Sequence, residues 1–281
     1  MKSACMPWRA RRCRMDDYLA PGWEFLVAGN DLEGFDALWN LQADWFEPPN
    51  HRRGGWSGVS RVKLKRPDGG QEYIFLKRQE NHLRKTWRHP LVGEPTFRVE
   101  ARNLMLLNSK GVAAPRLLCY AERKGGNGWQ VVLATLELTG LEPLDQVIEK
   151  WQRNGWQAAR PSRHALLVQV AELLRRLHAL KLVHNALHPK HIFVDEKEGV
   201  CCLIDLEKMR ARLTRRSAML RDLDTLNRRV GPISRADRLR FLAVYLEKPP
   251  EDPLVRRTWR KLARMAQRRG KRRHDARGGH G

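Results

Sequence analysis

The feature that most constrains the fold of this sequence is a change near Gly140 in the spacing of its apolar residues. Before Gly140, β-branched and aromatic residues form short runs that are typical of strands, whereas after it apolar residues recur every three or four positions, as in helices. This order predicts an α+β fold with two lobes, a small β-rich lobe followed by a larger helical one. The chain of 281 residues is long enough for both lobes.

Two β-hairpins and one helix are predicted in the first half of the chain. The hairpins turn at 67–70 (Pro-Asp-Gly-Gly) and at 125–128 (Gly-Gly-Asn-Gly), which are strong turn signals. A helix is expected over 97–109, with Thr96 as its N-cap and Gly111 after its end. The strands of the hairpins are expected at 58–65, 72–78, 115–121 and 129–137.

The second half is predicted to be helical, with one interruption. Pro189 prevents a helix from running through its surroundings, because proline lacks the backbone N–H that a helix needs. Helices are expected at 143–151, at 162–180 and beyond Leu213, and a short hairpin is expected from 191–194 and 200–204.

We expect four segments along the chain. Residues 1–50 form an N-terminal extension, of which 1–14 are predicted to be disordered because they are basic and lack an apolar run; Met15 is a plausible alternative start. The tryptophan-rich part of this extension ends at Pro48-Pro49, which predicts a stiff break. The other segments are the β-rich lobe at 51–138, the helical lobe at 139–250 and a basic tail at 251–281.

The charge of the chain predicts a polyanionic partner, since 54 Lys and Arg residues against 31 Asp and Glu residues give a formal net charge of +23. Eleven basic residues lie in 256–281, against one acid, and six lie in 208–221, against none. Trp259 and Leu262 are interleaved with the basic residues of the tail, which favours an amphipathic helix on an anionic membrane surface. A solvated tail is the alternative, and nucleic acid is disfavoured because no nucleic-acid-binding motif is present.

Cysteine spacing and hydropathy exclude two other classes of protein. The five cysteines form no C-x-x-C pair and no metal-ligand spacing, which favours free thiols in a reducing compartment. No apolar run reaches the roughly 18 residues of a membrane span, so the chain is not expected to cross a bilayer.

Four features lie in the order that a phosphate-transfer site needs. The first is the pattern of Gly54, Gly55 and Gly58, where glycines let backbone N–H groups approach phosphate oxygens; an ordinary glycine turn is the alternative interpretation. The second is Lys77, which ends an apolar strand, and the third is Glu100. Glu100 lies on the apolar face of its predicted helix, where a carboxylate is costly unless a cation meets it, and Lys77 is an available partner.

The fourth and strongest feature is the segment 184–194 (His-Asn-Ala-Leu-His-Pro-Lys-His-Ile-Phe-Val), followed by Asp205. An exposed loop, a short hairpin and an aspartate after its second strand have the layout of a kinase catalytic loop and its metal-binding aspartate. Three histidines also suggest zinc, but Pro189 breaks the helical ligand spacing and no cysteine or H-E-x-x-H pattern accompanies them. We expect His184 to anchor the loop and His178 to face the core.

This combination resembles the lipopolysaccharide core kinase family, the sugar kinases that act on heptose or Kdo (3-deoxy-D-manno-octulosonic acid), and in particular its InaA-like branch. The resemblance extends from about Gly54 to about Arg229. It includes the strand lysine and the segments EARNLMLLNSKGVAAPRLL, HPKHIFV, LIDLEKMR and RDLDTLNRR. It implies a two-lobed protein-kinase-like fold that binds ATP and Mg²⁺ in its cleft.

The resemblance implies roles for the matching residues. Lys77 would hold the α- and β-phosphates of ATP, and Glu100 would orient this lysine. Glu137 and Leu138 would lie at the hinge and face the adenine. Asp205 would bind Mg²⁺, as would His191, which stands where protein kinases have a metal-binding asparagine.

Ala186 is the departure from the pattern, because it occupies the place of the aspartate that receives the proton of the substrate hydroxyl. General-base catalysis is worth about 10²–10⁴ in rate, whereas phosphoryl transfer depends mostly on positioning and on neutralising phosphate charge. A slow kinase, a kinase that uses His188 as its base, and a site that binds nucleotide without turnover are therefore three open hypotheses.

The resemblance thus predicts an ATP-dependent kinase that acts on a sugar of the lipopolysaccharide core or a related lipid-linked sugar. Such a substrate, made at the inner face of a bacterial membrane, favours a cytoplasmic protein that is peripheral to the inner membrane. The main alternative is a nucleotide-binding pseudokinase with a regulatory or scaffolding role in envelope stress.

Overall fold

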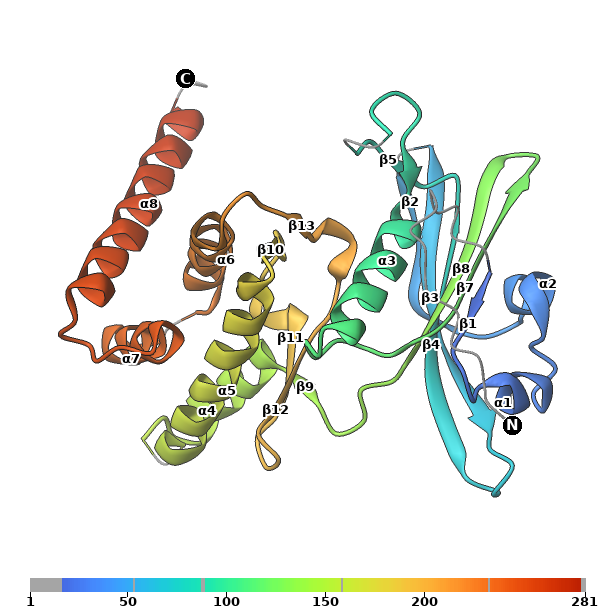
Figure 1. Ribbon diagram of the computed structural model, residues 1–281, viewed down its shortest axis with the longest axis horizontal. Coiled ribbons are helices and arrows are strands. Elements are labelled where there is room, and N and C mark those ends of the chain that lie inside the picture. The colour runs from blue at the N-terminus through green and yellow to red at the C-terminus, as the bar shows by residue number, and fades with distance from the viewer. Residues whose placement is uncertain (1–16, 53, 87–88, 158, 232, 279–281) are drawn as a thin grey trace, which may run out of the picture. The chain divides into compact units, whose positions relative to one another are not determined.

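The computed structural model describes residues 17–278 apart from 53, 87–88, 158 and 232, with side chains as far as 268. Contacts divide the chain into two compact units (Figure 1). The first, which we call the β unit, contains the described residues up to Ala101 together with Leu117–Glu137; the second, the helical unit, contains Arg102–Arg116 and the chain from Leu138 onward. The predictions on 1–14, Met15 and the two N-terminal cysteines lie outside the described residues.

The β unit is built on a six-stranded antiparallel sheet with the strand order β1-β7-β8-β4-β3-β2 (Figure 1). Both predicted hairpins are confirmed, because β3 pairs with β4 and β7 pairs with β8. The strands of the sheet are β1 (Tyr18–Leu19), β2 (Trp45–Arg52), β3 (Gly55–Lys65), β4 (Gln71–Glu80), β7 (Leu117–Gly125) and β8 (Gly128–Leu136). A separate small pair is formed by β5 (Leu83–Arg84) and β6 (Glu94–Pro95).

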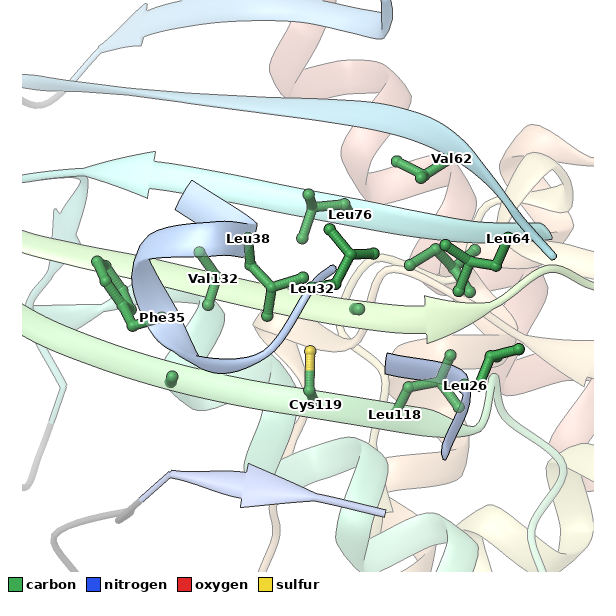
Figure 2. Close-up of a cluster of buried hydrophobic side chains, with 13 residues drawn as sticks. Leu26, Leu32, Phe35, Leu38, Val62, Leu64, Leu76, Leu118, Cys119 and Val132 are labelled. Carbon is green, nitrogen blue, oxygen red and sulfur yellow. The ribbon is translucent and has the colours of Figure 1, made fainter. Parts of the chain in front are cut away.

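Two short helices, α1 (Glu24–Ala28) and α2 (Gly34–Asn40), cover one face of this sheet. Leu26, Phe35 and Leu38 pack against alternate strand residues, because successive side chains of a strand point to opposite faces (Figure 2). The strand residues in this core are Val62, Leu64, Ile74, Leu76, Leu118, Cys119, Ala121, Val132 and Ala134.

The segment predicted as an N-terminal extension contributes to the same sheet and core. β1 pairs with β7, and the boundary expected at residue 50 falls inside β2. The break expected at Pro48-Pro49 is not formed: both prolines lie within β2, where the pairing with β3 shifts in register between Glu47 and Asn50. β2 is an edge strand, which tolerates proline because its outward side needs no ladder hydrogen bonds.

The helix predicted at 97–109 is confirmed as α3 (Thr96–Ser109), which begins in the β unit and ends in the helical unit. The N-cap assigned to Thr96 is wrong. Gln79 Oε1, on β4, accepts hydrogen bonds from Thr96 Oγ1 at 2.7 Å and from the Phe97 N–H at 3.0 Å. A side chain distant in sequence thus satisfies the first turn and attaches α3 to β4.

The helical unit confirms the change in character after Gly140. Its helices are α4 (Leu144–Asn154), α5 (Arg160–Ala179), α6 (Arg215–Arg229), α7 (Arg235–Leu246) and α8 (Pro253–Gly278). The predicted hairpin is formed by β11 (Ile192–Asp195) and β12 (Val200–Leu203), and β9 (Glu142–Pro143) pairs with β11. The remaining elements are β10 (Leu182–Val183), which pairs with β13 (Arg210–Ala211), and the 3₁₀ turns η1 (Pro189–His191) and η2 (Leu206–Lys208).

The apolar side of α8 packs against the helical unit. Val255 and Leu262 are buried, and Trp259 lines an apolar cavity of about 160 Å³ bounded mainly by side chains of α4, α5, α6, α7 and α8. Leu262 therefore packs against the protein, Trp259 is half-buried and the described basic side chains of α8 are exposed, while attachment to a membrane stays a prediction. No helix in the described part of the chain has the length and apolarity that crossing a bilayer requires.

The described cysteines are free thiols in the core, as predicted. Cys119, Cys201 and Cys202 are buried, and burial raises the pKa of each thiol to about 12. These groups are protonated at neutral pH and poorly reactive.

Candidate functional site

The β unit contains the ion pair that the sequence predicted between a strand and a helix. Leu76 points into the core, so Lys77, the next residue of β4, points to the opposite face of the sheet. Lys77 Nζ lies 2.6 Å from Glu100 Oε1 on α3. The Glu100 carboxylate is buried, and the lysine is its compensating cation. The structure therefore shows the ion pair itself, whereas the binding of nucleotide phosphates by Lys77 stays a prediction.

The first two predicted glycines lie where β2 turns into β3: Gly54 is in the turn and Gly55 is the first residue of β3. Gly54 has a φ of +76°, which favours glycine, and its carbonyl accepts a hydrogen bond from Asn81 Nδ2 at 3.1 Å. A side chain on Gly55 would place its Cβ 2.1 Å from the carbonyl oxygen of Glu80, so only glycine allows this close approach.

Gly58 has a packing role that the sequence did not predict. It lies within β3 rather than in the turn, and an added Cβ would be 2.7 Å from the ring of Trp45. The absence of a side chain at Gly58 therefore makes room for a tryptophan of the neighbouring strand β2. Its predicted contact with phosphate remains a prediction, as do those of Gly54 and Gly55.

The predicted hinge residues lie where one unit ends and the other begins. The β unit ends at Glu137, and Leu138 belongs to the helical unit. The Glu137 carboxylate accepts two hydrogen bonds of 2.8 Å from the guanidinium of Arg61, and its backbone N–H donates to the carbonyl of Tyr73 at 2.9 Å. The Glu137 side chain is thus held by an arginine, and the adenine contact of these residues remains a prediction.

In the helical unit, His184 anchors the loop 184–191, as predicted. Its side chain is fully buried, and its Nε2 lies 2.9 Å from the carbonyl oxygen of Ile204, the residue before Asp205. A carbonyl can only accept, so Nε2 carries the proton. Burial lowers the pKa of His184, which keeps the ring neutral at neutral pH. His178 is also fully buried, as predicted.

Asp222 on α6 holds the start of the loop 184–191, a role that the sequence did not predict. Its buried carboxylate accepts hydrogen bonds from the backbone N–H groups of His184 (2.6 Å) and Asn185 (2.9 Å), and His178 Nε2 lies 3.1 Å from it. Asp222 therefore fixes the start of the loop to α6. The available signal was an acid on the buried side of a helix, within the segment RDLDTLNRR.

His191 and Asp205, the two predicted metal ligands, lie together. His191 Nε2 is 3.3 Å from Asp205 Oδ2, and His191 Nδ1 is 2.8 Å from the carbonyl oxygen of Ala186. Asp205 is in the left-handed region with a φ of +57°, which is uncommon for a residue other than glycine. The turn after it is fixed by Asn103 Nδ2, which donates to the carbonyls of Leu206 (2.7 Å) and Met209 (3.2 Å).

These two residues fit a divalent cation. With the proton on Nδ1, the Nε2 lone pair of His191 faces a carboxylate oxygen, so two acceptors lie side by side as ligands do. Within the described part of the chain no three His, Cys, Asp or Glu side chains are grouped to hold a metal. A cation here would complete its shell with water or phosphate oxygens, as Mg²⁺ commonly does.

His188, the candidate base, is half-buried beside His191, with the two ring centroids 5.4 Å apart. Burial lowers the pKa of His188 most, and nearby positive charges, those of Arg229, Lys190 and Lys208 among them, lower it further. The ring is therefore neutral at neutral pH and able to accept a proton. Ala186 itself is buried and supplies only its backbone carbonyl.

Comparisons with known proteins agree with the family resemblance seen in the sequence. A family model described as the lipopolysaccharide kinase (Kdo/WaaP) family matches residues 36–245. Protein InaA of Escherichia coli (strain K12) is 31% identical over 216 residues, which cover 75% of this chain and 94% of that protein. A solved structure of WaaP in complex with acyl carrier protein covers 90% of this chain and 99% of its own, with a TM-score of 0.64 and 22% identity. That likeness confirms the predicted protein-kinase-like fold.

Proposed function

The chain belongs to the lipopolysaccharide kinase (Kdo/WaaP) family, and we propose on this basis that it transfers the γ-phosphate of ATP to a hydroxyl of a heptose or Kdo sugar. The observation that carries the proposal is the ion pair between Lys77 and Glu100. A buried carboxylate that holds a strand lysine in a fixed position suits a lysine that neutralises nucleotide phosphates.

ATP is proposed to contact several residues of the β unit. Lys77 would bind the α- and β-phosphates, and Gly54, where an added Cβ would meet nothing within 4 Å, is proposed to let backbone approach phosphate. Glu137 and Leu138 are proposed to meet the adenine through the backbone, because Arg61 already engages the Glu137 carboxylate.

Mg²⁺ is proposed to be held by His191 and Asp205, whose facing acceptors support this role. When bound, the ion would neutralise charge on the transferred phosphate. His188 is proposed as the base that accepts the hydroxyl proton, since a lowered pKa leaves its ring unprotonated at neutral pH.

A second candidate function is favoured by Ala186, which leaves no carboxylate at the position of the usual base. In this alternative the chain binds nucleotide without turnover, as a pseudokinase with a regulatory or scaffolding role in envelope stress. The ion pair and the metal ligands would then serve binding alone.

Two partners are proposed beside the acceptor sugar. The exposed basic residues Arg257, Arg260, Lys261 and Arg264 of α8 support electrostatic attachment to the anionic inner face of the inner membrane. Acyl carrier protein is the partner in the solved WaaP complex. The apolar cavity of the helical unit supports such a partner, because an acyl chain is a ligand that this lining would accept.

Transfer of radiolabel from ATP to isolated core oligosaccharide tests the proposed function. We expect labelled oligosaccharide with the wild-type chain and none with Asp205→Ala. ATP binding without transfer to any core saccharide would contradict the kinase proposal and favour the pseudokinase.

A further inference from the structure

Four basic side chains are gathered around the loop 184–191. Lys190 belongs to the loop itself, and Lys208 ends the turn η2 that follows Asp205. Arg221 and Arg229 lie on α6, two helical turns apart. Lys190, Lys208 and Arg229 are exposed, and Arg221 is half-buried. We call these four residues the cationic cluster; all of them belong to the helical unit.

The cationic cluster is tied to the loop by contacts and by charge. Arg221 Nε donates to Asn185 Oδ1 at 3.2 Å, and Asn185 Nδ2 lies 3.5 Å from the carbonyl oxygen of Lys208. The positive charges of Arg229, Lys190 and Lys208 also act on the ring of His188. Arg221 and the backbone of Lys208 thus meet at Asn185, the residue before Ala186, and Lys190 belongs to the same loop.

The carboxylates near the cationic cluster are already engaged, and the buried Asp222 carboxylate accepts from the backbone N–H groups of His184 and Asn185. Lys208 pairs with its neighbour Glu207 at 3.4 Å, and Asp205 is engaged by His191. In the described part of the chain, no ion pair joins Lys190, Arg221 or Arg229 to a carboxylate. Like charges held close together repel unless an anion binds among them, and they raise the local concentration of anions. This arrangement fits a ligand that is itself negatively charged.

We propose that the cationic cluster binds an anionic group of the acceptor, a phosphate or a carboxylate carried near the hydroxyl that is phosphorylated. The inference rests on the proposed function, and it adds that the acceptor is recognised through an anionic group rather than through its neutral hydroxyls alone. Arginine and lysine heads suit either anion, since both bind carboxylate and phosphate oxygens through charge-assisted hydrogen bonds.

The experiment compares three purified core oligosaccharides that differ in one anionic group: one with a phosphate beside the acceptor sugar, one with a Kdo carboxylate and one that is neutral. Their dissociation constants are measured by calorimetry in the presence of Mg²⁺ and a non-hydrolysable ATP analogue. We expect at least one acidic oligosaccharide to bind at least ten-fold more tightly than the neutral one, and high salt to remove this advantage. Which acidic oligosaccharide binds more tightly identifies the anion.

The matched variants are Lys208→Gln/Arg229→Gln and, as a control with the same loss of charge, Arg235→Gln/Lys248→Gln at exposed positions. The first double variant should weaken the affinity for the acidic oligosaccharide at least ten-fold and leave the affinity for the neutral one unchanged. The control should change neither affinity.

Equal affinity of the wild-type chain for acidic and neutral oligosaccharides, or an equal effect of both double variants, would overturn the inference. Loss of nucleotide affinity in the first variant alone would assign the cluster to ATP instead. Failure of the wild-type chain to bind the analogue at all would contradict the proposed function, separately from the inference.

Discussion

His191 Nδ1 lies 2.8 Å from the carbonyl oxygen of Ala186, so Nδ1 donates to this carbonyl and Nε2 is the ring nitrogen that faces Asp205. Ala186 therefore orients His191 through its backbone carbonyl. Any residue at position 186 would supply this carbonyl, so the orientation of His191, a proposed metal ligand, does not depend on the side chain at 186.

His191→Ala should reduce the additional stabilisation that Mg²⁺ gives to ATP-bound protein, because one of two proposed ligands is removed. His191→Asn should keep more of it, since the amide supplies an oxygen. Melting temperatures with ATP alone and with ATP and Mg²⁺ measure the difference. His89→Ala, at an exposed position, is the control. Equal Mg²⁺ dependence in all three variants would remove His191 from the metal site.

ATP with Mg²⁺ should raise the melting temperature of the wild-type chain. Linkage adds about 2.7 kcal/mol when ATP is present at 100 times its Kd. Lys77→Met should abolish this rise, and Glu100→Gln should reduce it. A double-mutant cycle on the apo protein should give a coupling of about 0.5–3 kcal/mol for the two residues. Coupling without any loss of ATP binding would make the pair purely structural.

Ala186→Asp and His188→Ala separate the three hypotheses for the base. If a slow kinase has only lost its base, the new carboxylate should raise turnover ten-fold or more, within the range of about 10²–10⁴ for general-base catalysis. If His188 is the base, as we propose, His188→Ala should lower the rate steeply and Ala186→Asp should add little. Neither variant should transfer phosphate if the chain is a pseudokinase.

The pH profile gives an independent check on His188. Its pKa is lowered, so the neutral form predominates above the pKa and is lost as the pH falls through it. The rate should therefore be constant at neutral pH and should decline only at a pH below the ordinary value of about 6.5. An acid limb that survives in His188→Ala would belong to another group.

Binding to anionic vesicles should depend on the exposed charges of α8. Replacing Arg257, Arg260, Lys261 and Arg264 with Gln removes charges worth up to about 1 kcal/mol each near such a surface. Binding in a vesicle co-sedimentation assay should fall strongly, while the melting temperature stays close to that of the wild type because the buried side of α8 is intact. Unchanged vesicle binding would show that the exposed basic side chains of α8 are only solvated and do not attach the protein to a membrane.

Loss of the Asp222 carboxylate should destabilise the fold and the loop together. Asp222→Ala leaves the N–H groups of His184 and Asn185 without their partner. Each unsatisfied buried group costs about 1–3 kcal/mol, so the free energy of unfolding should fall by at least about 2 kcal/mol in urea titration. Asp195→Ala, in an exposed turn, should cost much less.

The sequence by itself determined the order of elements and much of the site. Turn residues such as those at 67–70 encode a hairpin locally, and the spacing of apolar residues encodes helices. The main strands and helices of both lobes could therefore be predicted from the sequence. The contact between Lys77 and Glu100 was also predictable, because a carboxylate on an apolar helix face requires a cation and a strand lysine preceded it.

Only the tertiary structure decided features that depend on residues far apart in the chain. The first turn of α3 is capped by Gln79 of β4, and Gly58 leaves room for the ring of Trp45. Val255 and Leu262 of α8 are buried against the protein. From the sequence alone, Asp222 cannot be told from any other acidic residue of a helix, because its partner, the backbone N–H of His184, is distant in the chain. Local patterns record which face of an element is apolar, but the partner that covers this face is chosen by burial and hydrogen bonding across the whole fold.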